Sequence, residues 1–151
     1  MYLLDVNVLI ALADPLHVHS DRTNRWFASI QGEAWATCPL VENGFLRIMG
    51  SPSYHESPGP PQVINSLLRE IRTRPGHQFW ADSFSLCDYD ALPSSKHLAD
   101  FYLLALAVRH RARFATHDRR IDPAAIVGGE EAYCVILPEP ASPSVPDRPG
   151  K

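Results

Sequence analysis

Cysteine is scarce in this sequence and long apolar runs are absent, and each shortage excludes a class of protein. The three cysteines among its 151 residues, Cys38, Cys87 and Cys134, lie far apart and form no Cys-x-x-Cys pair. They indicate neither a disulfide framework nor a zinc knuckle, and a reducing compartment is expected. The most apolar stretch, residues 98–108, contains an aspartate and reaches about half of the ~20 residues that a membrane-spanning helix needs. A membrane-spanning protein is therefore not expected.

Strong charge of either sign is also missing. The 17 acidic and 14 basic residues leave a net charge of −3, so overall charge offers no attraction to nucleic acid or to an anionic membrane. A hydrophobic content of 45% and a charged content of 21% are typical of a soluble globular protein, and the length fits a single domain. The first residues carry no basic segment and no clear cleavage site, so a cytoplasmic location is expected.

Short apolar runs alternate along the chain with segments of helical periodicity. The runs predict strands at residues 2–4, 34–37, 77–80, 113–116 and 133–137. Helices are expected between Asp5 and Asp14 and at about 19–30, 39–49, 62–72 and 98–108, while 51–61 reads as a loop. This alternation predicts an α/β fold with three layers, in which helices cover both faces of a mostly parallel sheet of about five strands. It defines a domain at 1–137, followed by a flexible proline-rich tail at 138–151.

Four acidic residues occupy positions where such a fold could use them. Ligands bind beyond the carboxyl ends of the strands; Asp5 closes the first strand and Asp118 follows the fourth by two residues. Asp100 lies in the first turn of the most apolar helix, and Glu42 lies beside the apolar face of the helix at 39–49. Each acid alone has a structural explanation: a cap or turn for Asp5 and Asp118, solvation for Glu42, and the free amides of a helix end for Asp100.

Together the four acids indicate a metal site. Four carboxylates brought close would repel one another and raise one another's pKa unless a divalent cation neutralised them. Ligand sets made only of oxygen suit Mg²⁺ or Mn²⁺. Such an ion can activate water for in-line attack on a phosphodiester. We therefore expect a catalytic Mg²⁺ or Mn²⁺ site formed by Asp5, Glu42, Asp100 and Asp118.

The stretches that contain these acids resemble the four motifs of PIN domains: Leu3–Ile10, Leu40–Asn43, Leu98–Ala107 and Ala115–Asp118. Their order and spacing, over about residues 1–137, are similar to those of VapC toxins from bacterial toxin–antitoxin pairs. The resemblance implies a metal-dependent endoribonuclease that cleaves structured RNA such as transfer or ribosomal RNA, is blocked by a VapB-type antitoxin and forms a homodimer. It also implies that Asn7 and Thr116 support the acids by hydrogen bonds. Val6 departs from the threonine that is common there, which removes a hydroxyl but no ligand.

Arginines provide the candidate contacts to the RNA backbone. Arg119 and Arg120, next to Asp118, are the preferred RNA-binding residues. A wider rim would add Arg47, Arg109, Arg111 and Arg113, although residues 109–113 also suit the end of a helix. The histidines show no zinc spacing with the cysteines, and the three tryptophans are expected in the core rather than stacked on bases.

Two other functions remain open at this point. The sequence Asp5-Val6-Asn7 after a strand resembles the Asp-x-Asp loop of haloacid-dehalogenase-like phosphatases, but Asn7 cannot serve as the general acid that the second aspartate provides. A domain of the same fold that only binds RNA or protein is the second alternative. The presence of all four acids disfavours it, because a binding surface does not need concentrated negative charge.

Overall fold

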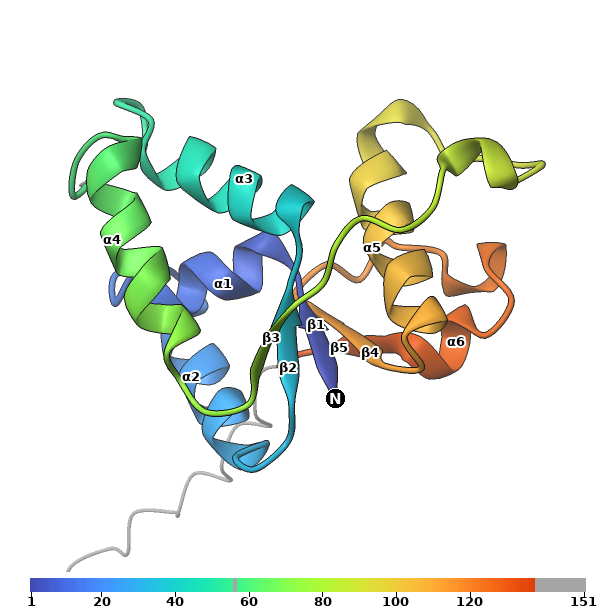
Figure 1. Ribbon diagram of the computed structural model, residues 1–151, viewed down its shortest axis with the longest axis horizontal. Coiled ribbons are helices and arrows are strands. Elements are labelled where there is room, and N and C mark those ends of the chain that lie inside the picture. Colours follow the sequence, from blue (N-terminus) through green and yellow to red (C-terminus); the bar gives the residue numbers. More distant parts are fainter. Residues whose placement is uncertain (56, 138–151) are drawn as a thin grey trace, which may run out of the picture.

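Five short strands form one parallel sheet, in the order β3-β2-β1-β4-β5, in a computed structural model that describes residues 1–55 and 57–137 (Figure 1). The predicted tail at 138–151 lies outside the described residues. The strands are β1 (Tyr2–Leu4), β2 (Trp35–Thr37), β3 (His77–Phe79), β4 (Arg113–Thr116) and β5 (Tyr133–Val135). All four strand pairs are parallel, with Leu3 in register with Ala36 on one side and with Phe114 on the other.

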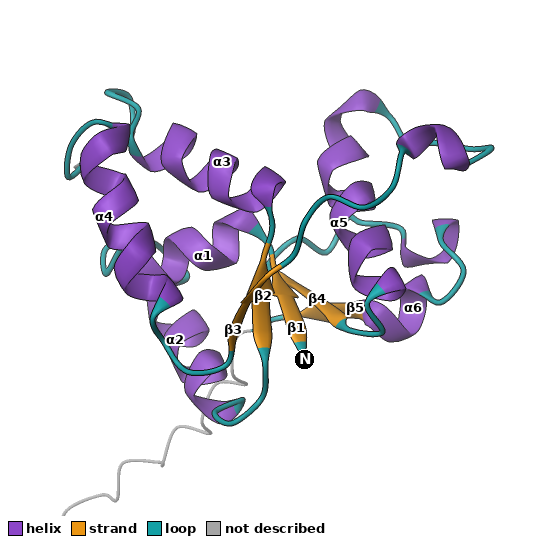
Figure 2. Ribbon diagram, in the orientation of Figure 1, coloured by secondary structure: helices purple, strands orange, loops and turns teal. Residues whose placement is uncertain are grey.

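Helices cover both faces of the sheet, so the predicted three-layer α/β fold is confirmed (Figure 2). One layer contains α1 (Val6–Ala13), α2 (Ser20–Ser29), α3 (Pro39–Met49) and α4 (Pro61–Arg72). The other contains α5 (Leu98–Arg109) and the short α6 (Gly129–Ala132), with single 3₁₀ turns at Leu86–Asp88, Ser95–His97 and Pro123–Ala125. No helix within the described ranges has the length and apolar character needed to cross a membrane.

Burial of the strands explains why they are so apolar. Every residue of β1 and β2 is buried, because a central parallel strand is covered on both faces. The edge strand β3 is more polar and mostly exposed. Helix α5 is also covered on most sides: residues 103–107 are all buried, since this helix packs against β1, β4 and α6. Its long apolar run is thus a core helix.

The tryptophans lie in or against this core, as expected. Trp35 and Trp80 are 1% and 6% exposed. Trp26 is half-buried and packs edge-on against Tyr2, with ring centroids 5.3 Å apart. Burying large aromatic surfaces is among the strongest contributions to a core of this size. The three tryptophan rings therefore contribute to the core rather than to a surface on which bases could stack.

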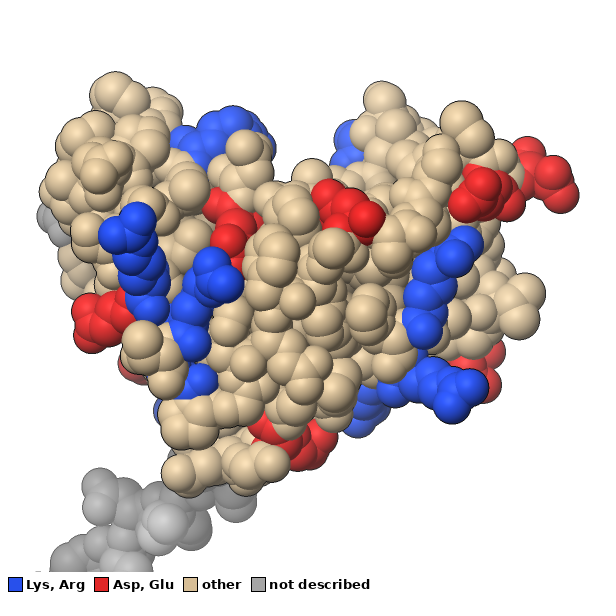
Figure 3. Space-filling view, viewed as in Figure 1, with Lys and Arg blue, Asp and Glu red and all other residues tan. Residues whose placement is uncertain are grey.

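The strand order reverses direction at β1, and this reversal locates the candidate site. The chain builds β1, β2 and β3 outward to one side, and then returns through α5 to place β4 on the other side of β1. In open α/β sheets, ligands bind outside the carboxyl ends of the strands at such a switch point. Asp5 follows β1 and Asp118 follows β4 at this edge. Figure 3 shows the molecule hollowed between α3 and α5, with acidic side chains near the hollow.

Candidate functional site

Asp5 is a buried carboxylate at the centre of the site. Its backbone is the N-cap of α1, but its side chain caps no amide; instead Oδ2 accepts a 2.7 Å hydrogen bond from Thr116 Oγ1. Burial, at 3% exposure, raises the pKa of Asp5 to about 6; the Thr116 bond opposes this shift and the charge of Asp100 adds to it. Asp5 is thus the N-cap residue of α1 by its backbone position, but its side chain makes no capping hydrogen bond.

Thr116, the last residue of β4, connects two of the acids. Its hydroxyl donates to Asp5 and accepts a 3.0 Å hydrogen bond from the backbone N–H of Asp118. The side chain of Thr116 is fully buried, so both bonds are made away from bulk water. The hydrogen bond expected from Thr116 is present, and it fixes Asp5 relative to the loop after β4.

Asp100 adds a third carboxylate from the opposite helical layer. It is the third residue of α5, and its Oδ2 lies 3.8 Å from Nδ1 of His97. Burial raises the pKa of Asp100, and the negative charge of Asp118 raises it further. Because Asp100 acts on Asp5 and Asp118 acts on Asp100, these three carboxylates share one electrostatic environment.

Asp118 differs from the other two acids because it has a cationic partner. Arg120 donates to it in the bidentate manner, from Nε to Oδ1 at 3.0 Å and from Nη2 to Oδ2 at 2.8 Å. The hydrogen bonds from Arg120 hold the pKa of Asp118 below its ordinary value. The hydroxyl of Tyr133 donates to the Asp118 carbonyl and anchors the loop from β5. Arg120, predicted to contact RNA, is thus engaged with a site carboxylate, whereas the neighbouring Arg119 is exposed.

Glu42 is held at the end of β2 by contacts that the sequence did not reveal. Oε1 of Glu42 accepts a 2.6 Å hydrogen bond from Thr37 Oγ1 and lies 3.5 Å from Nε of Arg72. Since the Thr37 hydroxyl donates to Glu42, Nε2 of His77, at 2.9 Å, must donate to Thr37. The solvated alternative for Glu42 is therefore wrong. A signal was available, because Thr37 ends β2 as Thr116 ends β4.

The remaining predicted residues divide by their position on the sheet. Asn7 is exposed and lines a hollow beside Asp118, but it makes no side-chain hydrogen bond to a residue within the described part of the chain. Arg109 and Arg113 lie where α5 ends and β4 begins, at the amino edge of the sheet and opposite the carboxylates. Arg109 forms an ion pair with Asp88, in which Nη2 lies 3.8 Å from Oδ2. These positions, like that of Arg111 between them, suit the end of a helix, and they lie at the edge of the sheet opposite the carboxylates.

The donor set of the three clustered acids suits a hard divalent cation. Within residues 1–55 and 57–137, no three His, Cys, Asp or Glu side chains stand close enough to ligate one ion together. Mg²⁺ usually takes only one or two carboxylates and keeps several waters, so the acids fit a hydrated ion better than a closed protein cage. Burial, and to a smaller extent neighbouring negative charge, raises the pKa of Asp5 and of Asp100, and a bound cation would favour the charged form of both acids.

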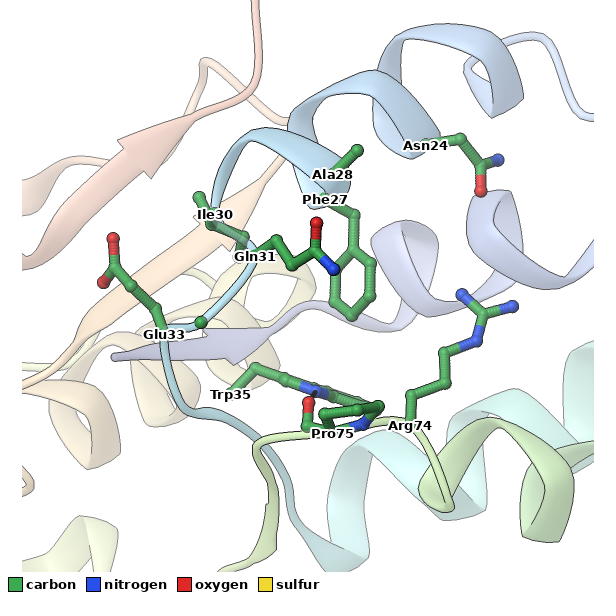
Figure 4. Close-up of a pocket in the computed structure, with 10 residues that line it drawn as sticks. Asn24, Phe27, Ala28, Ile30, Gln31, Glu33, Trp35, Arg74 and Pro75 are labelled. Carbon is green, nitrogen blue, oxygen red and sulfur yellow. Dashed lines mark hydrogen bonds between the residues drawn. The ribbon is translucent and has the colours of Figure 1, made fainter.

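A separate pocket of about 370 Å³ lies away from the acids and shares no residue with them (Figure 4). Phe27 and Trp35 meet edge to face in it, with ring centroids 5.3 Å apart. Trp35 begins β2, so this pocket lies at the amino edge of the sheet. Its mainly apolar lining has no group of carboxylates, and the candidate chemistry remains at the carboxyl edge.

Comparison with known proteins agrees with this architecture. The family model of the PIN domain matches residues 2–127. Ribonuclease VapC44 of Mycobacterium tuberculosis (strain ATCC 25618 / H37Rv) is 38% identical over 140 residues, which cover 89% of this chain and 98% of that protein. Ribonuclease VapC39 of the same strain is 37% identical over 131 residues, covering 83% and 94%.

A solved structure is similar in fold. The crystal structure of VapBC2 from Rickettsia felis bound to a DNA fragment from their promoter matches with a TM-score of 0.54 and 12% identity, over 78% of this chain and 87% of that chain. At this level of identity the likeness concerns the fold alone. It places the same α/β architecture in a chain of that complex.

Proposed function

The chain belongs to the PIN-domain family and is of the VapC type, and we propose that it is a toxin endoribonuclease that hydrolyses phosphodiester bonds in RNA with Mg²⁺ or Mn²⁺. The names of relatives that match over nearly their whole length support the ribonuclease activity. The observation that carries the proposal is the convergence of Asp5, Asp100 and Asp118 at the switch point of the sheet. Buried acids with raised pKa values in such a place are typical of functional sites.

A hydrated ion would bind among Asp5, Asp100 and Asp118, with one or two carboxylates as direct ligands and the others reached through its waters, and Glu42 completes the proposed set of four. When bound, the ion supplies positive charge beside the scissile phosphate and lowers the pKa of a water molecule to that of a usable nucleophile. The family match removes the phosphatase alternative for the Asp5-Val6-Asn7 loop. A non-catalytic binding domain remains as an outcome that the experiment below would reveal.

The chain's own residues orient the acids and hold the substrate. Thr116 turns Asp5 toward the site and Thr37 does the same for Glu42, so neither carboxylate has to be ordered when the substrate arrives. Asn7 is proposed to support the cluster from the start of α1. Arg119, which is exposed beside Asp118, would contact the RNA backbone by pairing with phosphate.

The partners follow from the VapC type and stand as proposals. We propose structured RNA, such as transfer or ribosomal RNA, as the substrate, and a VapB-type antitoxin as the protein that blocks the site. The name of the VapBC2 complex supports such a pairing. A homodimer and a cytoplasmic location complete the proposal.

The test is cleavage of total structured RNA by purified, antitoxin-free protein in Mg²⁺, Mn²⁺ or EDTA. Asp100→Asn is run in parallel, with Asp90→Asn as the matched control because Asp90 is exposed and lies outside the acidic cluster. We expect fragments that require the metal, appear with Asp90→Asn and are absent with Asp100→Asn. Well-folded protein that cleaves nothing with any metal would support the non-catalytic binding domain instead.

A further inference from the structure

A pocket of about 320 Å³ that the proposed chemistry does not use lies between two loops beside α5. The loop before α5 contributes Leu92 and Pro93, and the segment after β4 contributes Ile121 and Ala125. Phe101 of α5 lines it as well. Ligand pockets run from about 300 to 1,000 Å³, so this one has room for a single small ring system rather than for a longer segment of polymer.

The pocket adjoins the acidic cluster through two of its lining residues, His97 and Arg120. Nδ1 of His97 lies 3.8 Å from Oδ2 of Asp100, and Arg120 donates two side-chain hydrogen bonds to Asp118. Each of these two side chains thus contacts a candidate metal-binding acid as well as the pocket. A nucleotide whose phosphate lies at the acids therefore has the pocket within reach of its base.

The lining combines apolar walls with a fixed cationic plane. Leu92, Phe101 and Ile121 are apolar, and Leu92 is 49% exposed. Arg120 is exposed, but its bidentate pairing with Asp118 holds the guanidinium group in one orientation. A guanidinium held in this way offers a flat face on which a base can stack. Because Asp118 already balances the charge of Arg120, this side chain suits a neutral base better than a second phosphate.

Asp122 places a hydrogen-bond acceptor at the same pocket. Its Oδ1 accepts a 3.1 Å hydrogen bond from the backbone N–H of Ala124, which fixes the carboxylate at the start of the 3₁₀ turn Pro123–Ala125. A carboxylate can accept from the N–H groups at the edge of a base, whereas an ionised phosphodiester has no N–H or O–H to donate. An apolar side chain of a protein partner would use the walls and leave this acceptor unused. The lining is therefore complementary to a nucleobase, which has apolar faces and a polar edge.

We propose that this pocket receives the base of the nucleotide next to the scissile phosphate, with Arg120 as its stacking partner and Asp122 as the acceptor at its edge. The inference rests on the proposed function and adds to it the point at which the protein reads RNA sequence, since contacts to phosphates carry no sequence information. It also gives Arg120 a contact with RNA that is compatible with its pairing to Asp118.

The experiment follows isotope-labelled methyl groups of the full-length protein by NMR during titration with the 5′-monophosphates of adenosine, guanosine, cytidine and uridine, in EDTA and in Mg²⁺. These probes contain no internucleotide bond, so the measurement does not depend on cleavage. We expect the methyl signals of Leu92, Ile121 and Ala125 to shift, because an aromatic base changes the magnetic field at protons beside its ring. Ala28 and Ile30, which line the separate pocket of Figure 4, should not respond.

Ribose 5-phosphate is the matched probe without a base, and it should leave the methyl groups of the pocket unshifted. If none of the four nucleotides shifts them in either condition, or if ribose 5-phosphate shifts them equally, the base subsite is overturned.

Ala125→Phe fills the pocket, and Ala124→Phe is the matched control, because Ala124 is exposed and its side chain lies outside the lining. A stacked base contributes about 5-fold or more in affinity. We therefore expect Ala125→Phe to weaken nucleotide binding by at least about 5-fold and Ala124→Phe to leave it unchanged. Equal binding by the wild type and Ala125→Phe would overturn the proposal. If Ala125→Phe does not fold, Ala91→Phe fills the same pocket from the exposed loop before α5.

The two proposals fail separately. Base binding by protein that cleaves no RNA with any metal would leave the pocket standing and refute the nuclease. Metal-dependent cleavage by protein whose pocket responds to no nucleotide would do the reverse. Shifts of the same methyl groups with N-acetyl-leucinamide, and with no nucleotide, would assign the pocket to an apolar side chain of a protein partner and overturn the base subsite.

Discussion

The stability of the Asp5→Asn variant tests the central claim that Asp5 is a buried acid kept for function. The pKa of Asp5 is about 6 in the folded chain, against an ordinary value of 3.8 for an exposed aspartate. Below about pH 4 the group is protonated in both the folded and the unfolded chain, while between about 4 and 6 only the folded chain holds the proton. The free energy of unfolding therefore falls as the pH rises through this window. Above it, the carboxylate costs about 3 kcal/mol of stability.

Asparagine removes this cost, because its amide oxygen can still accept from Thr116. At pH 7.5 in EDTA, Asp5→Asn should be more stable than wild type by up to about 3 kcal/mol, or roughly 10 °C in Tm, and by roughly half as much at pH 5. Urea unfolding at several pH values measures the difference. Asp118→Asn is the control, and its effect should have the opposite sign. Because Arg120 lowers the pKa of Asp118, removing the Asp118 carboxylate should lower the free energy of unfolding at neutral pH. An Asp5→Asn variant that is no more stable than wild type at pH 7.5, or whose advantage does not change with pH, would refute the reasoning.

Three further substitutions test individual contacts. Thr116→Val leaves Asp5 and the Asp118 amide each without a partner and should cost about 2 kcal/mol or more in urea unfolding, whereas Thr116→Ser should retain most of the stability; equal losses would contradict the role of the hydroxyl. Thr37→Val frees Glu42 and should slow RNA cleavage, with recovery in Thr37→Ser; equal rates in the two variants would argue against it. Gly76→Ala should lower stability by more than about 1 kcal/mol, because φ is +83° and the new Cβ would lie 2.7 Å from the Glu33 carbonyl oxygen. Gly32→Ala, at φ +96° with open space around the new Cβ, should lower stability by less. A thermal melt in which Gly32→Ala loses more stability than Gly76→Ala would contradict the proposed clash with the Glu33 carbonyl.

The fold could be predicted from the sequence because its signals are local. Each central strand is a short apolar run and each long helix has a buried stripe, so the five strands and five longer helices were placed within a few residues. Helix α6 (Gly129–Ala132) was missed, because four residues contain too little periodicity to be recognised. Residues 83–89, for which the sequence predicts neither a strand nor a helix, contain a single 3₁₀ turn, Leu86–Asp88, with a capping box from Ser85. The conformation of such short elements is determined by tertiary packing rather than by the local sequence pattern.

The site could be predicted only in part because its contacts are not local. Asp5 and Thr116 are 111 residues apart, and their proximity follows from the pairing of β1 with β4, which no local pattern states. The positions of the four acids in the predicted fold singled them out, and the resemblance to PIN domains added Thr116. It did not supply the partners of Glu42, and spacing alone favoured solvent for that residue. The pairing of Arg120 with Asp118 was also unforeseen, because two residues of separation place both in a loop of undefined geometry.

The acids of this site are held in place by different means, and the difference has a consequence for charge. Asp118 is neutralised by Arg120, whereas Asp5 accepts a hydrogen bond from the neutral hydroxyl of Thr116 and has a pKa of about 6. A divalent ion arriving at the cluster would therefore find its largest electrostatic gain at Asp5 and Asp100, where negative charge is least compensated. In this arrangement Arg120 orients Asp118, and its positive charge does not repel the ion bound beside Asp5. This uneven distribution of charge is the physical reason to regard Asp5 as the centre of the site.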